Sequence, residues 1–364
     1  MTITTLFSPI TVGKINLSHR IVLCPLTRLR ANKDAVPNDL MKEYYSQRAT
    51  EGGLLITEAT FISRHAGTSP GAPGIYTQNQ INGWKKITDG VHSKGGSIFL
   101  QLWHLGRVAI AADNEGQQPI SASEITINGN SDNGRPHEKP RIVTVPEMKE
   151  ILQQYRQAAL NAMEAGFDGV EIHSANGYLL DQFINSSSNM RTDAYGGSIK
   201  NRCRFSLEVI DTIVDAIGAN RTAIRFSPWS GYKDVEDETP YETWGYLVQS
   251  IQNNHPDLGY IHFIEPRLDK NMDGHKETEN TLDPFRKIWK GPFISAGSYT
   301  HDVNLASETV KRTGNLIGFG RLFIANPDLV ERIRHNLPFN KYNRATFYVG
   351  KEVGYTDYPF YESK

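Results

Sequence analysis

The sequence predicts an α/β protein that forms a single (β/α)8 TIM barrel. Three observations favour this fold: eight short apolar runs that suit strands buried on both faces, helix-period segments between them, and polar or glycine residues directly after most of the runs. An open doubly wound sheet is the alternative. No Gly-x-Gly-x-x-Gly follows an early strand, and Gly318-Phe319-Gly320 lacks the third glycine. We therefore expect one barrel domain over residues 1–364.

The predicted strands follow one another at spacings that leave room for a helix between most pairs. In chain order they are Ile21–Leu23, 54–57, 97–102, Gly169–His173, 223–227, Tyr260–Ile264, Phe293–Ala296 and Leu316–Phe319. Among the helices, one has apolar residues at helical spacing from 81 to 91 and ends near Gly95, and another runs to Gly218. A third begins at Thr144, which forms a capping-box pair with Glu147. The polar stretch 111–141 is expected to be an insertion after strand three, on the catalytic face.

Charge and composition narrow the class of function. A formal net charge of -1 gives no field that would collect nucleic acid or an anionic membrane. The two cysteines, Cys24 and Cys203, lie far apart and indicate neither a disulfide framework nor a metal site. Without a leader segment or an apolar stretch of roughly 20 residues, we expect a cytoplasmic protein, a monomer or a homodimer, that acts on a small molecule.

Chemically active residues gather after the predicted strands, where a barrel places its active site. The clearest group is His173, Asn176 and Tyr178, which follow strand four. Two further pairs, Gly297-Ser298 after strand seven and Gly320-Arg321 after strand eight, match the phosphate cradle common in barrels. Arg225 lies within the apolar strand five, and a buried charge there requires an anionic partner.

Taken together, these residues identify the chain as similar to the old yellow enzyme family of FMN-dependent ene reductases, over nearly its whole length. The matching runs are Pro25-Leu26-Thr27-Arg28, Gln101-Leu-Trp-His-Leu-Gly-Arg107, His173-Ser-Ala-Asn-Gly-Tyr178, Arg191-Thr-Asp-Ala-Tyr-Gly-Gly-Ser198, Gly320-Arg321 and Asn326-Pro-Asp-Leu329. Thr27 stands where another branch of the family has cysteine, which indicates the classical branch.

The resemblance implies non-covalent FMN across the barrel mouth, with its phosphate on Gly297, Ser298, Gly320 and Arg321. Thr27 would donate to the flavin C4 carbonyl, Gln101 would bond the pyrimidine edge, and Arg225 would lie near N1 and the C2 carbonyl. Further contacts would come from the loops around the ring, namely from Pro25, Leu26, Ala59, Phe347 and Tyr348.

For the substrate, the resemblance implies an activated alkene whose carbonyl or nitro oxygen is held by His173 and Asn176. Reduced FMN would deliver hydride to the β-carbon, and Tyr178 would protonate the α-carbon. Trp103 and Met272 are further candidates for the substrate pocket. NADPH or NADH would reduce the flavin at the same place, which predicts ping-pong kinetics.

Two alternatives remain open at this stage. A flavin-dependent isomerase of a secondary-metabolite pathway is the first, but such relatives usually lack the tyrosine, and Tyr178 is present. A non-catalytic barrel that binds a phosphate ligand is the second. It would not explain why Thr27, Gln101 and Arg225 occur together.

Overall fold

Parallel strands form a closed barrel in the computed structural model, which describes residues 3–67, 69–131, 134–266, 278–300 and 302–362. The barrel strands are β3 (Ile21–Leu23), β4 (Leu54–Ile56), β6 (Ser97–Trp103), β9 (Gly169–His173), β10 (Thr222–Phe226), β11 (Tyr260–Ile264), β12 (Phe293–Ala296) and β13 (Leu316–Phe319). Their order is β4-β3-β13-β12-β11-β10-β9-β6, and pairing of β4 with β6 closes the ring. The predicted (β/α)8 barrel is confirmed, and no strand boundary differs from the prediction by more than one residue.

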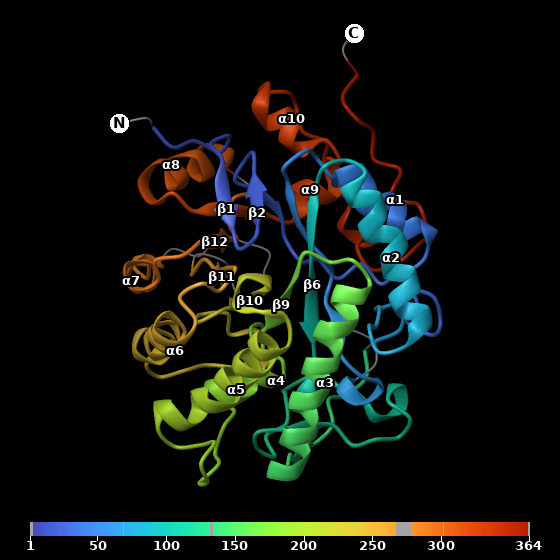
Figure 1. Ribbon diagram of the computed structural model, residues 1–364. Coiled ribbons are helices and arrows are strands. Elements are labelled where there is room, and N and C mark those ends of the chain that lie inside the picture. The colour runs from blue at the N-terminus through green and yellow to red at the C-terminus, as the bar shows by residue number, and fades with distance from the viewer. Residues whose placement is uncertain (1–2, 68, 132–133, 267–277, 301, 363–364) are drawn as a thin grey trace.

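Helices cover the outside of the barrel (Figure 1). They are α1 (Asp39–Arg48), α2 (Gln78–His92), α3 (Val145–Glu164), α4 (Leu179–Ile184), α5 (Ile199–Ile217), α6 (Pro240–Asn254), α7 (Asp283–Ile288), α8 (Val303–Thr313), α9 (Arg321–Ala325) and α10 (Leu329–Arg334). The predicted capping box is confirmed, because the Thr144 side chain accepts from the Glu147 N–H and the Glu147 side chain accepts from the Thr144 N–H. No helix within the described ranges combines the length and apolar character that a membrane span needs.

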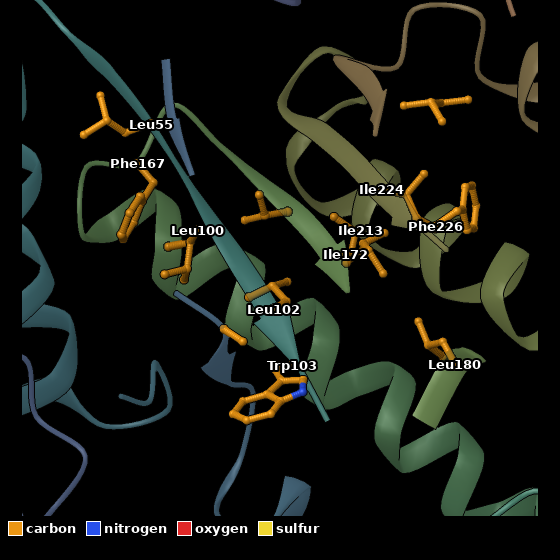
Figure 2. Packing of buried hydrophobic residues seen from close by; sticks show 14 of the residues in the cluster. Leu55, Leu100, Leu102, Trp103, Phe167, Ile172, Leu180, Ile213, Ile224 and Phe226 are labelled. Carbon is orange, nitrogen blue, oxygen red and sulfur yellow. The ribbon is translucent and has the colours of Figure 1, made fainter. Parts of the chain in front are cut away.

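The larger apolar core lies between the barrel and its helices. Figure 2 shows Leu102, Ile172 and Ile224 on three strands, with Leu180 of α4 and Ile213 of α5 among the helical residues of the same cluster. All five side chains are fully buried. Because side chains alternate along a strand, this outward face leaves the neighbouring positions of each strand pointing into the barrel.

A second apolar cluster fills the barrel interior at the N-terminal ends of the strands. Phe99, Tyr260 and Leu316 belong to it, together with Val12 and Leu17 of a hairpin that the sequence analysis did not predict. This hairpin consists of β1 (Ile10–Val12) and β2 (Ile15–Leu17). Two positions further along the strands the interior becomes polar: these residues are Gln101, Glu171, Arg225 and His262. The barrel interior is therefore apolar at one end and polar at the other.

The segment after β6 begins at the polar end of the barrel. It contains β7 (Ile120–Ser121) and β8 (Arg141–Ile142), which pair in parallel with each other. Before it in the chain, β5 (Thr60–Phe61) pairs with the last residues of β6, and Phe61 stacks on Trp103 with ring centroids 4.8 Å apart. Trp103 is thereby held at the rim by an aromatic neighbour.

Candidate active site

A chain of hydrogen bonds crosses the barrel interior just below the rim. Gln101 Nε2 donates to Glu171 Oε1 at 2.7 Å, and His262 Nδ1 lies 2.8 Å from Glu171 Oε2. Arg225 Nε approaches His262 Nε2 at 3.4 Å. Each of the four side chains comes from a different strand, and all are buried. The anionic partner that the buried Arg225 required is therefore supplied in part by Glu171, through His262.

His173 ends β9, two residues after Glu171, and pairs in register with Arg225 on β10. Burial, assisted by the nearby charge of Arg225, holds the pKa of His173 well below its usual value, so the ring is neutral. Its Nδ1 atom is buried and has no hydrogen-bond partner among the described residues. A buried polar atom without a partner is costly unless a ligand pairs with it.

Asn176 lies in the loop between β9 and α4 with an unusual backbone conformation. Its φ is 58°, and that of Gly177 is 73°, so two consecutive residues are left-handed. The Asn176 N–H donates to Ser227 Oγ at 2.7 Å, and the Gly177 N–H donates to Asp181 Oδ2 at 2.8 Å. Gln182 Nε2 donates to the Gly177 carbonyl at 2.7 Å. These bonds fix the loop, while Asn176 Oδ1 remains buried without a partner among the described residues.

Tyr178 completes the group that the sequence predicted. Its ring lies 4.8 Å from the His173 ring and 5.0 Å from the Trp103 ring, edge to face in both cases. The structure therefore brings His173, Tyr178 and Trp103 together at the rim of the barrel, next to the fixed Asn176 loop.

The loop after β3 forms the opposite side of the rim. Pro25, Leu26 and Thr27 are half-buried here. The loop is held by Glu58, whose Oε2 accepts from the backbone N–H groups of Arg28 at 3.1 Å and Leu29 at 3.3 Å. Ala59, the residue after Glu58, is buried.

The C-terminal segment reaches this loop from the far end of the chain. The Arg28 Nε donates to the Phe347 carbonyl at 3.0 Å. Phe347 is only 6 % exposed, whereas its neighbour Tyr348 is 56 % exposed. The structure thus brings Phe347 beside residues 25–28 and leaves most of the Tyr348 side chain open to solvent.

The predicted phosphate cradle is built from two adjacent parallel strands, since Ala296 pairs with Gly318. Just beyond these partners, Gly297 and Ser298 have φ values of 100° and 65°, and the buried Ser298 Oγ has no partner among the described residues. A Cβ on Gly320 would lie 3.2 Å from Leu26 Cδ2, so the turn before Arg321 passes close to the loop after β3. Left-handed turns with a free hydroxyl suit an anion such as the phosphate of FMN.

Several residues that shape the site escaped the sequence analysis. Glu171 and His262 lie within strands that the sequence analysis treats as apolar. The signal that could have found them is a charged or imidazole side chain on the inward-facing positions of these strands, which His173 and Arg225 also occupy. Glu58 and Asp181 carry no such signal, because they act on backbone N–H groups. Met272 lies outside the described residues.

Comparisons with known proteins agree over almost the whole chain. The model of the NADH:flavin oxidoreductase / NADH oxidase family matches residues 5–340. The chain is 48 % identical to 12-oxophytodienoate reductase 1 of Oryza sativa subsp. japonica, over 98 % of this chain and 93 % of the rice protein. It is 45 % identical to flavin oxidoreductase hxnT of Emericella nidulans, over 98 % and 97 % of the two chains.

Solved structures give the same result. Morphinone reductase in complex with tetrahydroNAD has a TM-score of 0.90 at 40 % identity, with 98 % of each chain covered. The old yellow enzyme homologue from Zymomonas mobilis has a TM-score of 0.91 at 38 % identity, with 98 % of this chain and 99 % of that chain covered. The chain therefore belongs to the NADH:flavin oxidoreductase / NADH oxidase family, that of the old yellow enzymes, and is an FMN-dependent oxidoreductase.

Proposed function

We propose that this protein is an ene reductase that uses NADPH or NADH to reduce the double bond of an α,β-unsaturated carbonyl compound or a nitroalkene. Bound FMN would supply the redox chemistry, taking hydride from the nicotinamide and passing it to the β-carbon of the alkene. The neighbours named above support a small activated alkene as the substrate class, because they include 12-oxophytodienoate and morphinone reductases.

Different residues of the rim would bind different parts of the flavin. Gly297, Ser298, Gly320 and Arg321 would hold the phosphate, and Thr27, Gln101 and Arg225 would bond the polar edge of the ring. Pro25, Leu26, Ala59, Phe347 and Tyr348 would border it. This division is supported by the free hydroxyl of Ser298 and by the convergence of the loops after β3, β12 and β13 on one rim.

The observation that carries the substrate assignment is the buried Nδ1 of His173, unpartnered among the described residues, next to the fixed loop that presents the Asn176 carboxamide with its NH2 donor. A neutral imidazole and a carboxamide can each donate one hydrogen bond to the same oxygen. Two such donors at a fixed position would stabilise the negative charge that develops on a carbonyl or nitro oxygen as hydride arrives at the β-carbon.

Tyr178 would then donate its phenolic proton to the α-carbon. A phenol suits this role because its ordinary pKa is about 10, so it keeps its proton at neutral pH until a carbanion-like centre forms. Its ring lies 4.8 Å from the His173 ring, within reach of a substrate bound there. Trp103, edge to face with Tyr178, would close one side of the pocket.

The test is Tyr178→Phe, which removes the proton donor and keeps the ring. We expect FMN binding and flavin bleaching by NADPH to stay unchanged, while the rate of flavin reoxidation by cyclohexenone under argon falls about 100-fold or more. Tyr195→Phe is the matched control, because the Tyr195 hydroxyl contacts Glu208, outside the proposed site. Reoxidation by Tyr178→Phe at the normal rate would show that the proton comes from elsewhere.

A further inference from the structure

One hydrogen-bonded chain contains Gln101, Glu171, His262 and Arg225. We assign Gln101 and Arg225 to the flavin, whereas Glu171 and His262 would not touch it. Glu171 and His262 are both fully buried, and both lie in the barrel interior. Glu171 is the common partner, since one of its oxygens accepts from Gln101 and the other faces His262. The catalytic steps proposed above use neither Glu171 nor His262.

The charge states within this chain follow from its contacts. Burial opposes ionisation of Glu171, but His262, Arg225 and Gln101 together hold the pKa of this carboxyl below its usual value. Burial also holds the pKa of His262 below its usual value, in spite of Glu171. The chain therefore contains one anion, Glu171, one cation, Arg225, and a neutral histidine between them.

These states fix where the protons lie. An ionised carboxylate only accepts hydrogen bonds, so it faces the Nδ1–H of His262 and the amide NH2 of Gln101. His262 Nε2 is then the acceptor for Arg225 Nε–H. Gln101 retains one N–H and its carbonyl oxygen, a donor and acceptor pair that matches the N3–H and a neighbouring carbonyl on the pyrimidine edge of a flavin.

We propose that Glu171 and His262 are positioning residues that set the reduction potential of the bound FMN. This inference rests on the proposed assignment of Gln101 and Arg225 to the flavin ring. Reduction of FMN by two electrons and one proton leaves negative charge near N1 and the C2 carbonyl, which Arg225 stabilises. Glu171 offsets that stabilisation, because its charge has the opposite sign and lies in the same buried layer. Glu171 thus keeps the reduced flavin a strong hydride donor.

The direct test is Glu171→Gln, which removes the charge at nearly constant volume. Gln101 and His262 face different oxygens of Glu171, and the new amide has a donor NH2 group in place of one of them, so the chain must also change at one point. We expect the equilibrium constant for flavin reduction to rise at least tenfold, a shift of about 30 mV to more positive potential for a two-electron couple. The measurement is equilibration with a reference dye under argon, together with dissociation constants for oxidised and reduced FMN.

Two further variants separate charge from simple structural support. Glu171→Asp keeps the charge with a shorter reach, so it should restore a near-normal potential even if FMN binds less tightly. His262→Leu removes a donor that keeps Glu171 ionised, so the potential should again become more positive; this variant also serves if Glu171→Gln does not fold. Asp237→Asn is the matched control, because Asp237 is a buried carboxylate that pairs with Arg202 outside the Glu171 chain, and the potential of this variant should equal that of the wild type.

The outcomes distinguish this inference from the function on which it rests. Arg225→Met should bind FMN less tightly and shift its potential to more negative values. If Arg225→Met changes neither quantity, the assignment of Arg225 to the flavin is wrong. If Arg225→Met behaves as expected but neither Glu171→Gln nor His262→Leu raises the potential, only the role of the Glu171 chain is refuted.

Discussion

Two segments border the rim of this barrel. One is held by hydrogen bonds from residues close to it in the chain, and the other by hydrogen bonds from distant residues. The Asn176 loop, residues 174–178, is fixed mainly by residues close to it in the chain, since Asp181 and Gln182 of the next helix bond both polar groups of the Gly177 backbone. The C-terminal segment, residues 344–356, is fixed by Arg28, Arg30 and Arg48, which are about 300 residues away and donate to its backbone carbonyls.

The difference shows two solutions to the same physical requirement. A backbone group that leaves water must find a partner, whether that partner is local or distant. Local bonds make the Asn176 loop rigid at the proposed site of proton and hydride transfer. The distant guanidinium groups instead attach the end of the chain to the first third of the sequence, so the border near Phe347 depends on the integrity of the whole barrel.

The largest effect should come from Arg48→Met. Arg48 is fully buried and donates to the carbonyls of Phe323, Ile324 and Tyr355. Leaving these carbonyls without a donor should lower the free energy of unfolding by about 3–5 kcal/mol. Urea unfolding measures the loss, and limited proteolysis should show earlier cleavage in residues 344–356 than in the Asn176 loop. A loss below about 1 kcal/mol, with unchanged proteolysis, would mean that the segment is not anchored by Arg48.

A second comparison concerns Glu58 and Asp181, the carboxyl groups that accept hydrogen bonds from the loop backbone on the two sides of the rim. Burial raises the pKa of Glu58 and that of Asp181 to about 7. The folded protein therefore binds more protons than the unfolded chain between about pH 4 and pH 7, and each group lowers stability as pH rises through this window. As pH rises from 4.5 to 7.5, the free energy of unfolding of Glu58→Gln and that of Asp181→Asn should each increase by about 3 kcal/mol relative to the wild type.

Urea unfolding at several pH values between these limits measures that gain. If the pH dependence of a variant matches that of the wild type, the replaced carboxyl does not have a raised pKa in the folded protein. If only one of the two variants differs, the two sides of the rim are not electrostatically equivalent.

The smallest effect is expected for Ser227→Ala, which leaves the buried N–H of Asn176 without its acceptor. The cost to stability should be about 1–2 kcal/mol. Because Asn176 is proposed to bind the substrate oxygen, the KM for cyclohexenone should rise severalfold, with a smaller change in kcat. Ser230→Ala, which removes only a bond to the Tyr232 N–H, is the control. An unchanged KM would indicate that the loop keeps its left-handed conformation without Ser227.

The contrast between the two segments also explains what could be predicted from the sequence. The strands were predictable because each is a short apolar run, and His173, Asn176 and Tyr178 were noticeable because they interrupt the apolar pattern at a strand end. The arginine contacts were not predictable, because the partners are backbone carbonyls, which every residue has. The hairpin β1–β2 was missed since its three-residue strands are too short for a clear alternation, and its partners come from the whole barrel.

That hairpin has a consequence for the order of folding. Val12 and Leu17 belong to the same buried cluster as Leu316, and β3 cannot complete its pairing until β13 has formed. During synthesis the hairpin must therefore wait for a strand that lies about 300 residues later in the chain, with its apolar side chains exposed in the meantime. Pairing over such a distance slows folding and prolongs the exposure of apolar side chains, which favours expression at low temperature or with a chaperone that shields the hairpin.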